Sequence, residues 1–169
     1  SYMNGSSSNM DDAANVLYVD DEQTNLFSFK ASFRKDFNVF TAETGAEGLE
    51  ILQNEVIHIA ISDQRMPEMS GIEFFQTAKK KYPDPIRILL TGYADINAVI
   101  DAINMGEVYR YLTKPWNAEE VKSVIRDGFD LFRLREENRI LTERLIKANE
   151  QLEFLLRQNL ISWLTTTCW

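Results

Sequence analysis

The sequence contains little of several residue types, and each shortage excludes a class of protein. Its single cysteine, Cys168, cannot form a disulfide within the chain. No apolar run reaches the roughly 18 residues of a membrane span, and none has the layout of a signal peptide. Basic side chains number 18 against 26 acidic ones, and the net charge of −8 disfavours a surface that binds nucleic acid directly. We therefore expect a cytoplasmic protein that contacts neither nucleic acid nor membrane.

The rest of the composition is that of a globular protein. Of the 169 residues, 44% are hydrophobic and 26% are charged, which is enough to bury the core of about one domain. The first residues differ, because the opening segment SYMNGSSSNMDD is polar, rich in Ser and Gly and without hydrophobic periodicity. We interpret residues 1–14 as a disordered lead or a tag remnant.

Short apolar runs rich in β-branched residues alternate with longer amphipathic stretches from Asn15 onward, a pattern typical of an α/β sheet. The five predicted strands are residues 16–19, 39–41, 57–61, 86–90 and 108–112. The predicted helices are residues 23–35, 46–54, 71–82, 95–104 and a last helix from residue 118. Right-handed crossovers then give a doubly wound parallel sheet. The carboxyl ends of its strands share one edge, where open α/β sheets bind ligands.

The last predicted helix carries an apolar heptad repeat over residues 129–160. The a positions are Leu131, Asn138, Leu145, Leu152 and Asn159, and the d positions are Leu134, Leu141, Ala148 and Leu155. A buried Asn at a reduces stability but favours a parallel, in-register dimer. We therefore predict a coiled-coil homodimer, preceded by an α/β domain at 15–128 and followed by a tail or truncation junction at 161–169. The alternative is that these leucines cover the α/β domain or a missing domain.

Polar residues follow four of the predicted strands at their carboxyl ends. They are the pair Asp20 and Asp21, then Asp63, Thr91 and Lys114. Three carboxylates at one edge repel each other unless a cation joins them, and oxygen-only ligands favour Mg²⁺ over softer metals. We therefore expect Mg²⁺ as the cofactor.

The same positions lie in motifs that resemble the receiver domain of bacterial two-component response regulators. The motifs are VLYVDDE with the acidic pair, ISDQRMPEMSG with Asp63, LLTGY with Thr91 and YRYLTKPW with Lys114. Each motif alone is weak, but all four occur in order after the expected strands. The resemblance extends from about Asn15 to Arg126, which is about two thirds of the chain. The resemblance implies a flavodoxin-like fold with strand order 2-1-3-4-5.

The resemblance also implies a role for each acidic residue. Asp63 would accept a phosphoryl group from a sensor histidine kinase and become an acyl phosphate. Asp21, Asp63 and the backbone carbonyl of Arg65 would bind Mg²⁺ directly, and Asp20 would reach it through water. The chain would then be a signalling receiver that catalyses only its own phosphorylation and dephosphorylation.

Other residues would bind the phosphoryl group or change conformation in response to it. The resemblance implies that Lys114 pairs with one phosphoryl oxygen, that Thr91 hydrogen-bonds another, and that Tyr111 then turns toward the core. A cis peptide bond is implied at Pro115. The simpler roles are that Thr91 caps the following helix and that Tyr111 is an ordinary strand residue.

Three more residues carry narrower expectations. Arg65 and Tyr93, each two residues beyond a site residue, would shield the acyl phosphate from water and lengthen its lifetime. His58, the only histidine, lies in an apolar run, so we interpret it as a core or edge residue rather than a phosphate relay.

The functional prediction is a phosphoaccepting receiver that signals through its coiled-coil dimer to an output domain C-terminal to this chain. One alternative is a constitutive dimerisation module with a receiver that no longer switches. Another is a phosphatase that forms an aspartyl phosphate, which is disfavoured because Arg65 stands where a second acid would be needed.

Overall fold

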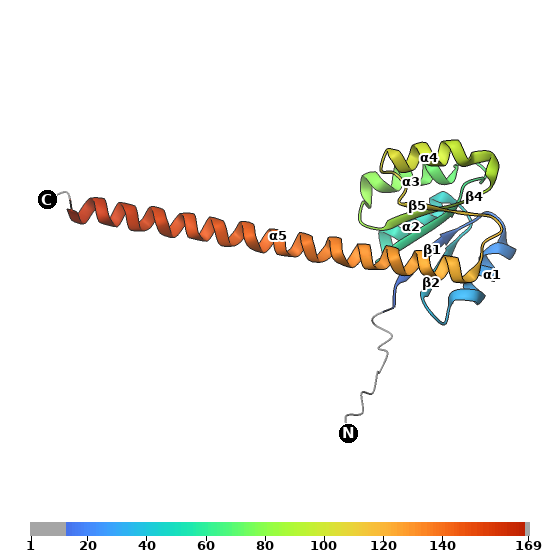
Figure 1. Cartoon of the computed structure of the whole chain (residues 1–169), viewed down its shortest axis with the longest axis horizontal. Helices are drawn as coiled ribbons and strands as arrows, with labels where there is room; N and C mark the ends of the chain where they lie inside the picture. Colours follow the sequence, from blue (N-terminus) through green and yellow to red (C-terminus); the bar gives the residue numbers. More distant parts are fainter. Residues whose placement is uncertain (1–12, 168–169) are drawn as a thin grey trace, which may run out of the picture. The chain divides into compact units, whose positions relative to one another are not determined.

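The computed structural model describes residues 13–167. Within this range five parallel strands form one sheet in the order β2-β1-β3-β4-β5 (Figure 1). The strands are β1 (Asn15–Val19), β2 (Asn38–Ala42), β3 (Ile59–Asp63), β4 (Ile86–Thr91) and β5 (Arg110–Thr113). The predicted fold class and strand order are confirmed.

Helices connect the strands as the alternating pattern predicted. They are α1 (Gln23–Phe33), α2 (Gly45–Asn54), α3 (Gly71–Lys81), α4 (Ile96–Asn104) and α5 (Ala118–Thr167), with a short 3₁₀ helix, η2 (Tyr93–Asp95), before α4. The hydroxyls of Thr44 and Ser70 accept hydrogen bonds from backbone N–H groups in the first turns of α2 and α3, which fixes where these helices begin. No helix in this part of the chain is both long and apolar enough to cross a membrane.

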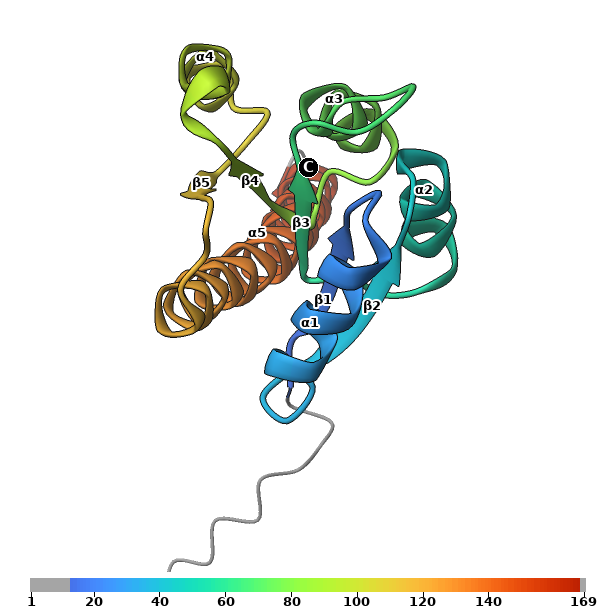
Figure 2. The same cartoon turned by 90° about the vertical axis from the view of Figure 1, so that its right-hand side faces the viewer.

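The sheet is covered on both faces, and each face has its own core (Figure 2). Phe29 and Phe33 of α1 pack with Ile125 of α5 on one face. Phe74 of α3 packs with residues of α2 and α4, such as Val99, on the other. Because β1, β3 and β4 are buried on both faces, their near-continuous apolar sequences are those of central parallel strands.

Several predicted boundaries were shifted. Residues 108 and 109 precede β5, and β4 includes Thr91, which was expected to follow the strand. Residues 57 and 58 precede β3, and the strand continues to Asp63, which places the carboxylate on the last residue of the strand rather than beyond it. Ala14 was assigned to the disordered lead, but it is buried in the first core and its carbonyl accepts a hydrogen bond from the Asn38 N–H at 3.0 Å. The rest of that segment, residues 1–12, lies outside the described residues.

Helix α5 is continuous through Gly128. A Cβ atom at this position would lie 2.9 Å from Cδ1 of Ile59 and 3.4 Å from Cγ2 of Ile86. The glycine therefore allows α5 to approach the sheet closely.

The chain divides into two units, residues 1–132 and residues 133–169. Leu131, predicted as the first a position of the coiled coil, is instead partly buried against the first core. The exposed leucines begin at Leu134. Within the second unit the chain stays helical to Thr167, so most of the predicted tail is part of α5, and residues 168–169 lie outside the described range.

Candidate functional site

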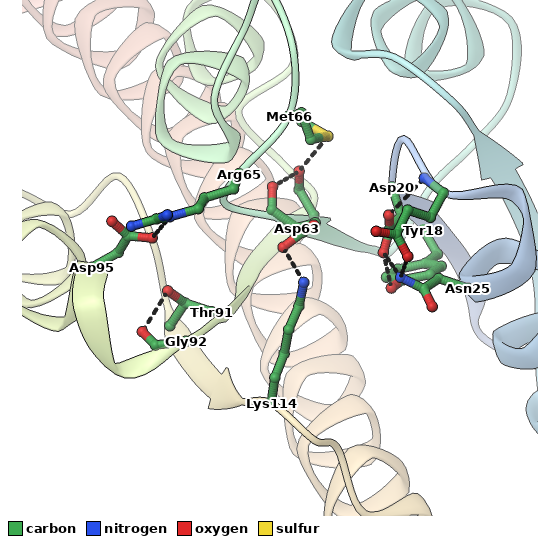
Figure 3. Close-up of polar contacts among 12 residues, drawn as sticks. Tyr18, Asp20, Asn25, Asp63, Arg65, Met66, Thr91, Gly92, Asp95 and Lys114 are labelled. Carbon is green, nitrogen blue, oxygen red and sulfur yellow. Dashed lines mark hydrogen bonds and ion pairs between the residues drawn. The ribbon is translucent and has the colours of Figure 1, made fainter.

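Asp63 and Lys114 form the central ion pair of the site. Asp63 ends β3 and is 5% exposed, and Lys114 follows β5. The Lys114 Nζ atom lies 2.8 Å from Oδ1 of Asp63 (Figure 3). Each residue comes from a different strand, and the parallel topology brings both to the carboxyl edge of the sheet.

Two further carboxylates lie beside Asp63. One carboxylate oxygen from each of Asp20, Asp21 and Asp63 lies within 4.8 Å of the others. Asp20 is fully buried, whereas Asp21 is exposed. Carboxylate oxygens are hard ligands of the kind that Mg²⁺ prefers. The single positive charge of Lys114 does not balance three carboxylates, so the remaining negative charge favours binding of a cation. The residues present therefore fit the expected metal.

The carboxylate of Asp20 is held by donors that the sequence interpretation did not identify. Its Oδ2 accepts hydrogen bonds from the Tyr18 hydroxyl at 2.7 Å and from the Asn25 side-chain amide at 3.1 Å (Figure 3). Its Oδ1 accepts one from the backbone N–H of Glu22 at 3.0 Å. Strand periodicity could have revealed Tyr18, because residues two apart on a strand share a face of the sheet.

Thr91 ends β4 and is almost fully buried. Its hydroxyl donates to the carbonyl of Gly92 at 3.2 Å, and its own carbonyl accepts a hydrogen bond from the Lys114 N–H at 2.9 Å. Gly92 precedes η2 and Asp95 precedes α4, so Thr91 caps neither helix. The backbone hydrogen bond from the Lys114 N–H places Thr91 beside Lys114 at the carboxyl edge of the sheet.

The two residues expected to shield an acyl phosphate face solvent. The Arg65 side chain is 73% exposed and its Nε forms an ion pair with Oδ2 of Asp95 at 2.9 Å. Tyr93 is 82% exposed. Tyr111 is partly buried and packs against the second core. Arg65 is therefore engaged by Asp95, and neither it nor Tyr93 is buried in the described part of the chain.

The backbone has an unusual conformation after Lys114 and a close approach between chain segments after Asp63. The Lys114–Pro115 peptide bond is cis, as the resemblance implied. A Cβ atom on Gly71 would lie 2.5 Å from the carbonyl oxygen of Asp63, and the Gly71 N–H donates to the carbonyl of Gln64 at 3.0 Å. Only glycine lets the start of α3 approach the end of β3 this closely.

His58 lies away from this edge, just before β3 and at the opposite end of that strand from Asp63. Its Nδ1 accepts a hydrogen bond from the Asn15 N–H at 2.8 Å, and its ring contacts Phe129 and Phe132 with centroids at 4.9 and 4.8 Å. The prediction of a structural histidine is confirmed.

The surroundings of Asp63 raise the pKa of its carboxyl. Burial is the main cause, and the hydrogen bond and charge of Lys114 act in the opposite direction. The neighbouring charges of Asp20 and Asp21 add to the increase. In the absence of a cation, the ionised form of Asp63 therefore lowers the stability of the folded protein.

We expect Asp63→Asn to be more stable than the wild type near neutral pH in Mg²⁺-free buffer. Because the pKa of Asp63 is higher in the folded state, the folded state binds more protons, and its stability falls as pH rises through that pKa. The difference in melting temperature between variant and wild type should therefore shrink as pH falls through the raised pKa of Asp63 toward the ordinary carboxyl value. Thermal melts from pH 4 to 8 measure it.

Added Mg²⁺ should reverse this order. At 100 times its Kd, Mg²⁺ would raise the wild-type free energy of unfolding by about 2.7 kcal/mol, and it would raise that of Asp63→Asn far less. A melting temperature that does not respond to Mg²⁺ in the wild type would contradict a cation site at Asp63.

Comparison with known proteins agrees with this geometry. Residues 16–126 match the model of the response regulator receiver domain. The hydrogenase transcriptional regulatory protein HoxA of Bradyrhizobium diazoefficiens is 31% identical over 122 residues, which are 72% of this chain and 25% of HoxA. The chain spans about a quarter to a third of the length of the curated relatives it matches.

Solved structures are also similar. An adenylate cyclase structure from Rhodopirellula baltica is 31% identical with a TM-score of 0.76, covering 78% of this chain and 98% of that one. A response regulator receiver domain from Clostridium thermocellum is 33% identical with a TM-score of 0.68, covering 72% and 98%. The chain belongs to the response regulator receiver domain family of two-component systems.

Proposed function

We propose that Asp63 is the phosphoacceptor of this receiver and that a sensor histidine kinase is the donor. The observation that carries the proposal is the 2.8 Å ion pair between Asp63 and Lys114 inside the carboxylate cluster. An oxygen of Asp63 would attack phosphorus, and the phosphorus–nitrogen bond of the donor's phosphohistidine would break. Its electron pair would stay on the imidazole, leaving an acyl phosphate on Asp63.

The other site residues would position and stabilise the transferring group. Lys114 would move its ion pair from the Asp63 carboxylate to a phosphoryl oxygen. Asp20, Asp21, Asp63 and the backbone carbonyl of Arg65 would hold Mg²⁺, with Asp20 acting through water. When bound, the metal would withdraw charge from the phosphoryl oxygens.

Thr91 and Tyr111 would convert phosphorylation into a change of shape. The Thr91 hydroxyl would exchange the Gly92 carbonyl for a phosphoryl oxygen, since a charged acceptor forms the stronger hydrogen bond. Gly92 and η2 would then move with Thr91, and the partly buried Tyr111 would turn further into the core. Arg65 and Asp95 tie η2 to the segment after β3.

The second unit supports a parallel coiled-coil dimer as the route to an output domain beyond this chain. Predicted a and d leucines are more than half exposed in the single chain; they are Leu134, Leu141, Leu145, Leu152 and Leu155. Arg139 instead pairs with Glu136 and Glu143 along the same helix, at b and f positions outside this seam. An isolated helix gains little stability in water, so burying the seam against a second copy would stabilise it.

The phosphoacceptor is tested by native mass spectrometry of the chain with Mg²⁺ and a small acyl-phosphate donor. We expect one phosphoryl group per chain in the wild type and none in Asp63→Asn. No gain under conditions that modify another receiver would contradict the proposal. Continuous hydrolysis of added phosphomonoesters would instead favour a phosphatase.

The dimer is tested by two adjacent charge substitutions in the second unit. Leu145→Glu places a charge in the seam, whereas Ile146→Glu places one at the neighbouring b position, which is similarly exposed. We expect the dimer dissociation constant to rise at least about tenfold in the first variant and to change little in the second, because only the first buries an unpaired charge. Analytical ultracentrifugation measures both.

Equal weakening in the two variants would contradict the assigned seam. A dimer fraction unchanged by phosphorylation, together with unchanged helix pairing, would favour the constitutive dimerisation module.

We also propose that Arg65 and Tyr93 lengthen the lifetime of the acyl phosphate. Arg65 is exposed and held by one exposed ion pair, which is weak, so a phosphoryl group on Asp63 would compete for its guanidinium. Once there, Arg65 and the nearby Tyr93 would exclude attacking water.

Phosphoryl loss should accordingly be several-fold faster in Arg65→Ala than in the wild type, because water gains access to phosphorus. Tyr93→Ala should act in the same direction. Asp95→Ala provides the matched control, since it frees Arg65 and should slow the loss or leave it unchanged. The decay of the phosphorylated mass peak gives all rates, and a wild-type rate equal to or above that of Arg65→Ala would contradict the proposal.

A further inference from the structure

Asp20 is bound by the protein in an unsymmetrical way. Each carboxylate oxygen can accept about two hydrogen bonds. Among residues 13–167, Oδ2 already accepts two hydrogen bonds, from the Tyr18 hydroxyl and the Asn25 amide, whereas Oδ1 accepts only one, from the backbone N–H of Glu22. One acceptor position therefore remains, and it lies on Oδ1.

We propose that Tyr18 and Asn25 are positioning residues for Asp20. Their hydrogen bonds occupy Oδ2, so that only Oδ1 is available to the water molecules around the cation. Of these two positioning residues, Tyr18 contributes more to how tightly the site binds Mg²⁺. This inference rests on the proposed function, because it requires Mg²⁺ at the carboxylate cluster.

The Tyr18 hydroxyl is a rigid donor. Tyr18 is 1% exposed, and its ring stacks on Phe29 with centroids 4.1 Å apart and planes inclined by 19°. Phe29 in turn contacts Phe33 and Trp116. The aromatic core therefore fixes the direction of the hydroxyl, and the hydroxyl fixes the carboxylate.

Asn25 is the weaker of the two donors. Its hydrogen bond to Oδ2 is longer than that of Tyr18, at 3.1 against 2.7 Å. Its side-chain amide also donates to the carboxylate of Glu22 at 3.2 Å. We therefore assign Asn25 a supporting role.

Holding Asp20 in place matters because its neighbours repel it. Asp63 is restrained by Lys114, while the hydrogen-bond donors to Asp20 in the part of the chain that the structure describes are all uncharged. Without the Tyr18 hydroxyl, the carboxylate of Asp20 would gain freedom to rotate away from Asp21 and Asp63. A cation would then have to reorder it on binding, and affinity would fall.

The test is a calorimetric Mg²⁺ titration of Tyr18→Phe and Asn25→Ala. We expect the Kd for Mg²⁺ to rise about tenfold in Tyr18→Phe, as for other residues that orient a metal ligand, and by less in Asn25→Ala. Tyr109→Phe is the matched control. It removes a hydroxyl from another tyrosine that packs on the first core, just before β5 and at the opposite end of that strand from Lys114, and its Kd should be unchanged.

Proton NMR tests which oxygen is reserved. The buried Tyr18 hydroxyl proton should give a downfield signal that is absent in Tyr18→Phe. The signal should persist when the wild type is saturated with Mg²⁺, because Oδ1, and not Oδ2, accepts the hydrogen bond from the hydration shell of the cation. Its loss on Mg²⁺ binding would show that the metal competes for Oδ2 and would overturn the inference.

The outcomes separate this inference from the proposed function. If the wild type binds no Mg²⁺, the cation site fails, and this inference fails with it. If the wild type binds Mg²⁺ and Tyr18→Phe binds it equally well or better, this inference alone is wrong. If circular dichroism shows Tyr18→Phe unfolded, the wild-type NMR signal and the Asn25→Ala titration still decide.

Discussion

The repulsion among three carboxylates at one edge of the sheet is the constraint on which the site depends. Asp20, Asp21 and Asp63 are brought within 4.8 Å of one another by strands that are separate in sequence and adjacent in the sheet. Lys114 offsets part of this charge, and burial makes the remainder costly. Unfavourable electrostatic energy is thus concentrated at this edge, and either a bound cation or neutralisation of Asp63 relieves it.

The two cores make this concentration of charge possible. Central strands buried on both faces form a rigid support, and glycines at Gly71 and Gly128 let helices approach that support closely. The first core also reaches the site directly, because the ring of Tyr18 belongs to it and its hydroxyl holds Asp20. Packing and electrostatics are therefore coupled through one side chain.

The loops around the site rest on weaker contacts than the strands that carry it. Thr91 donates to its neighbour's carbonyl, and Arg65 pairs with Asp95 at the surface. Each contact uses a donor that the proposed phosphoryl group on Asp63 would also attract. A rigid sheet with exchangeable loop contacts is the arrangement expected of a two-state switch.

The sequence by itself determined the class of fold, the order of its elements and the acidic, hydroxyl and lysine residues of the site. Hydrophobic alternation reports burial on both faces of a strand, and parallel strands must end at a common edge. Only the tertiary structure decided which residues these side chains contact. The donors to Asp20, the pairing of Arg65 with Asp95 and the packing of Leu131 against the first core join residues whose distance depends on how helices settle on the sheet. Periodicity along the chain carries no information about such contacts between elements.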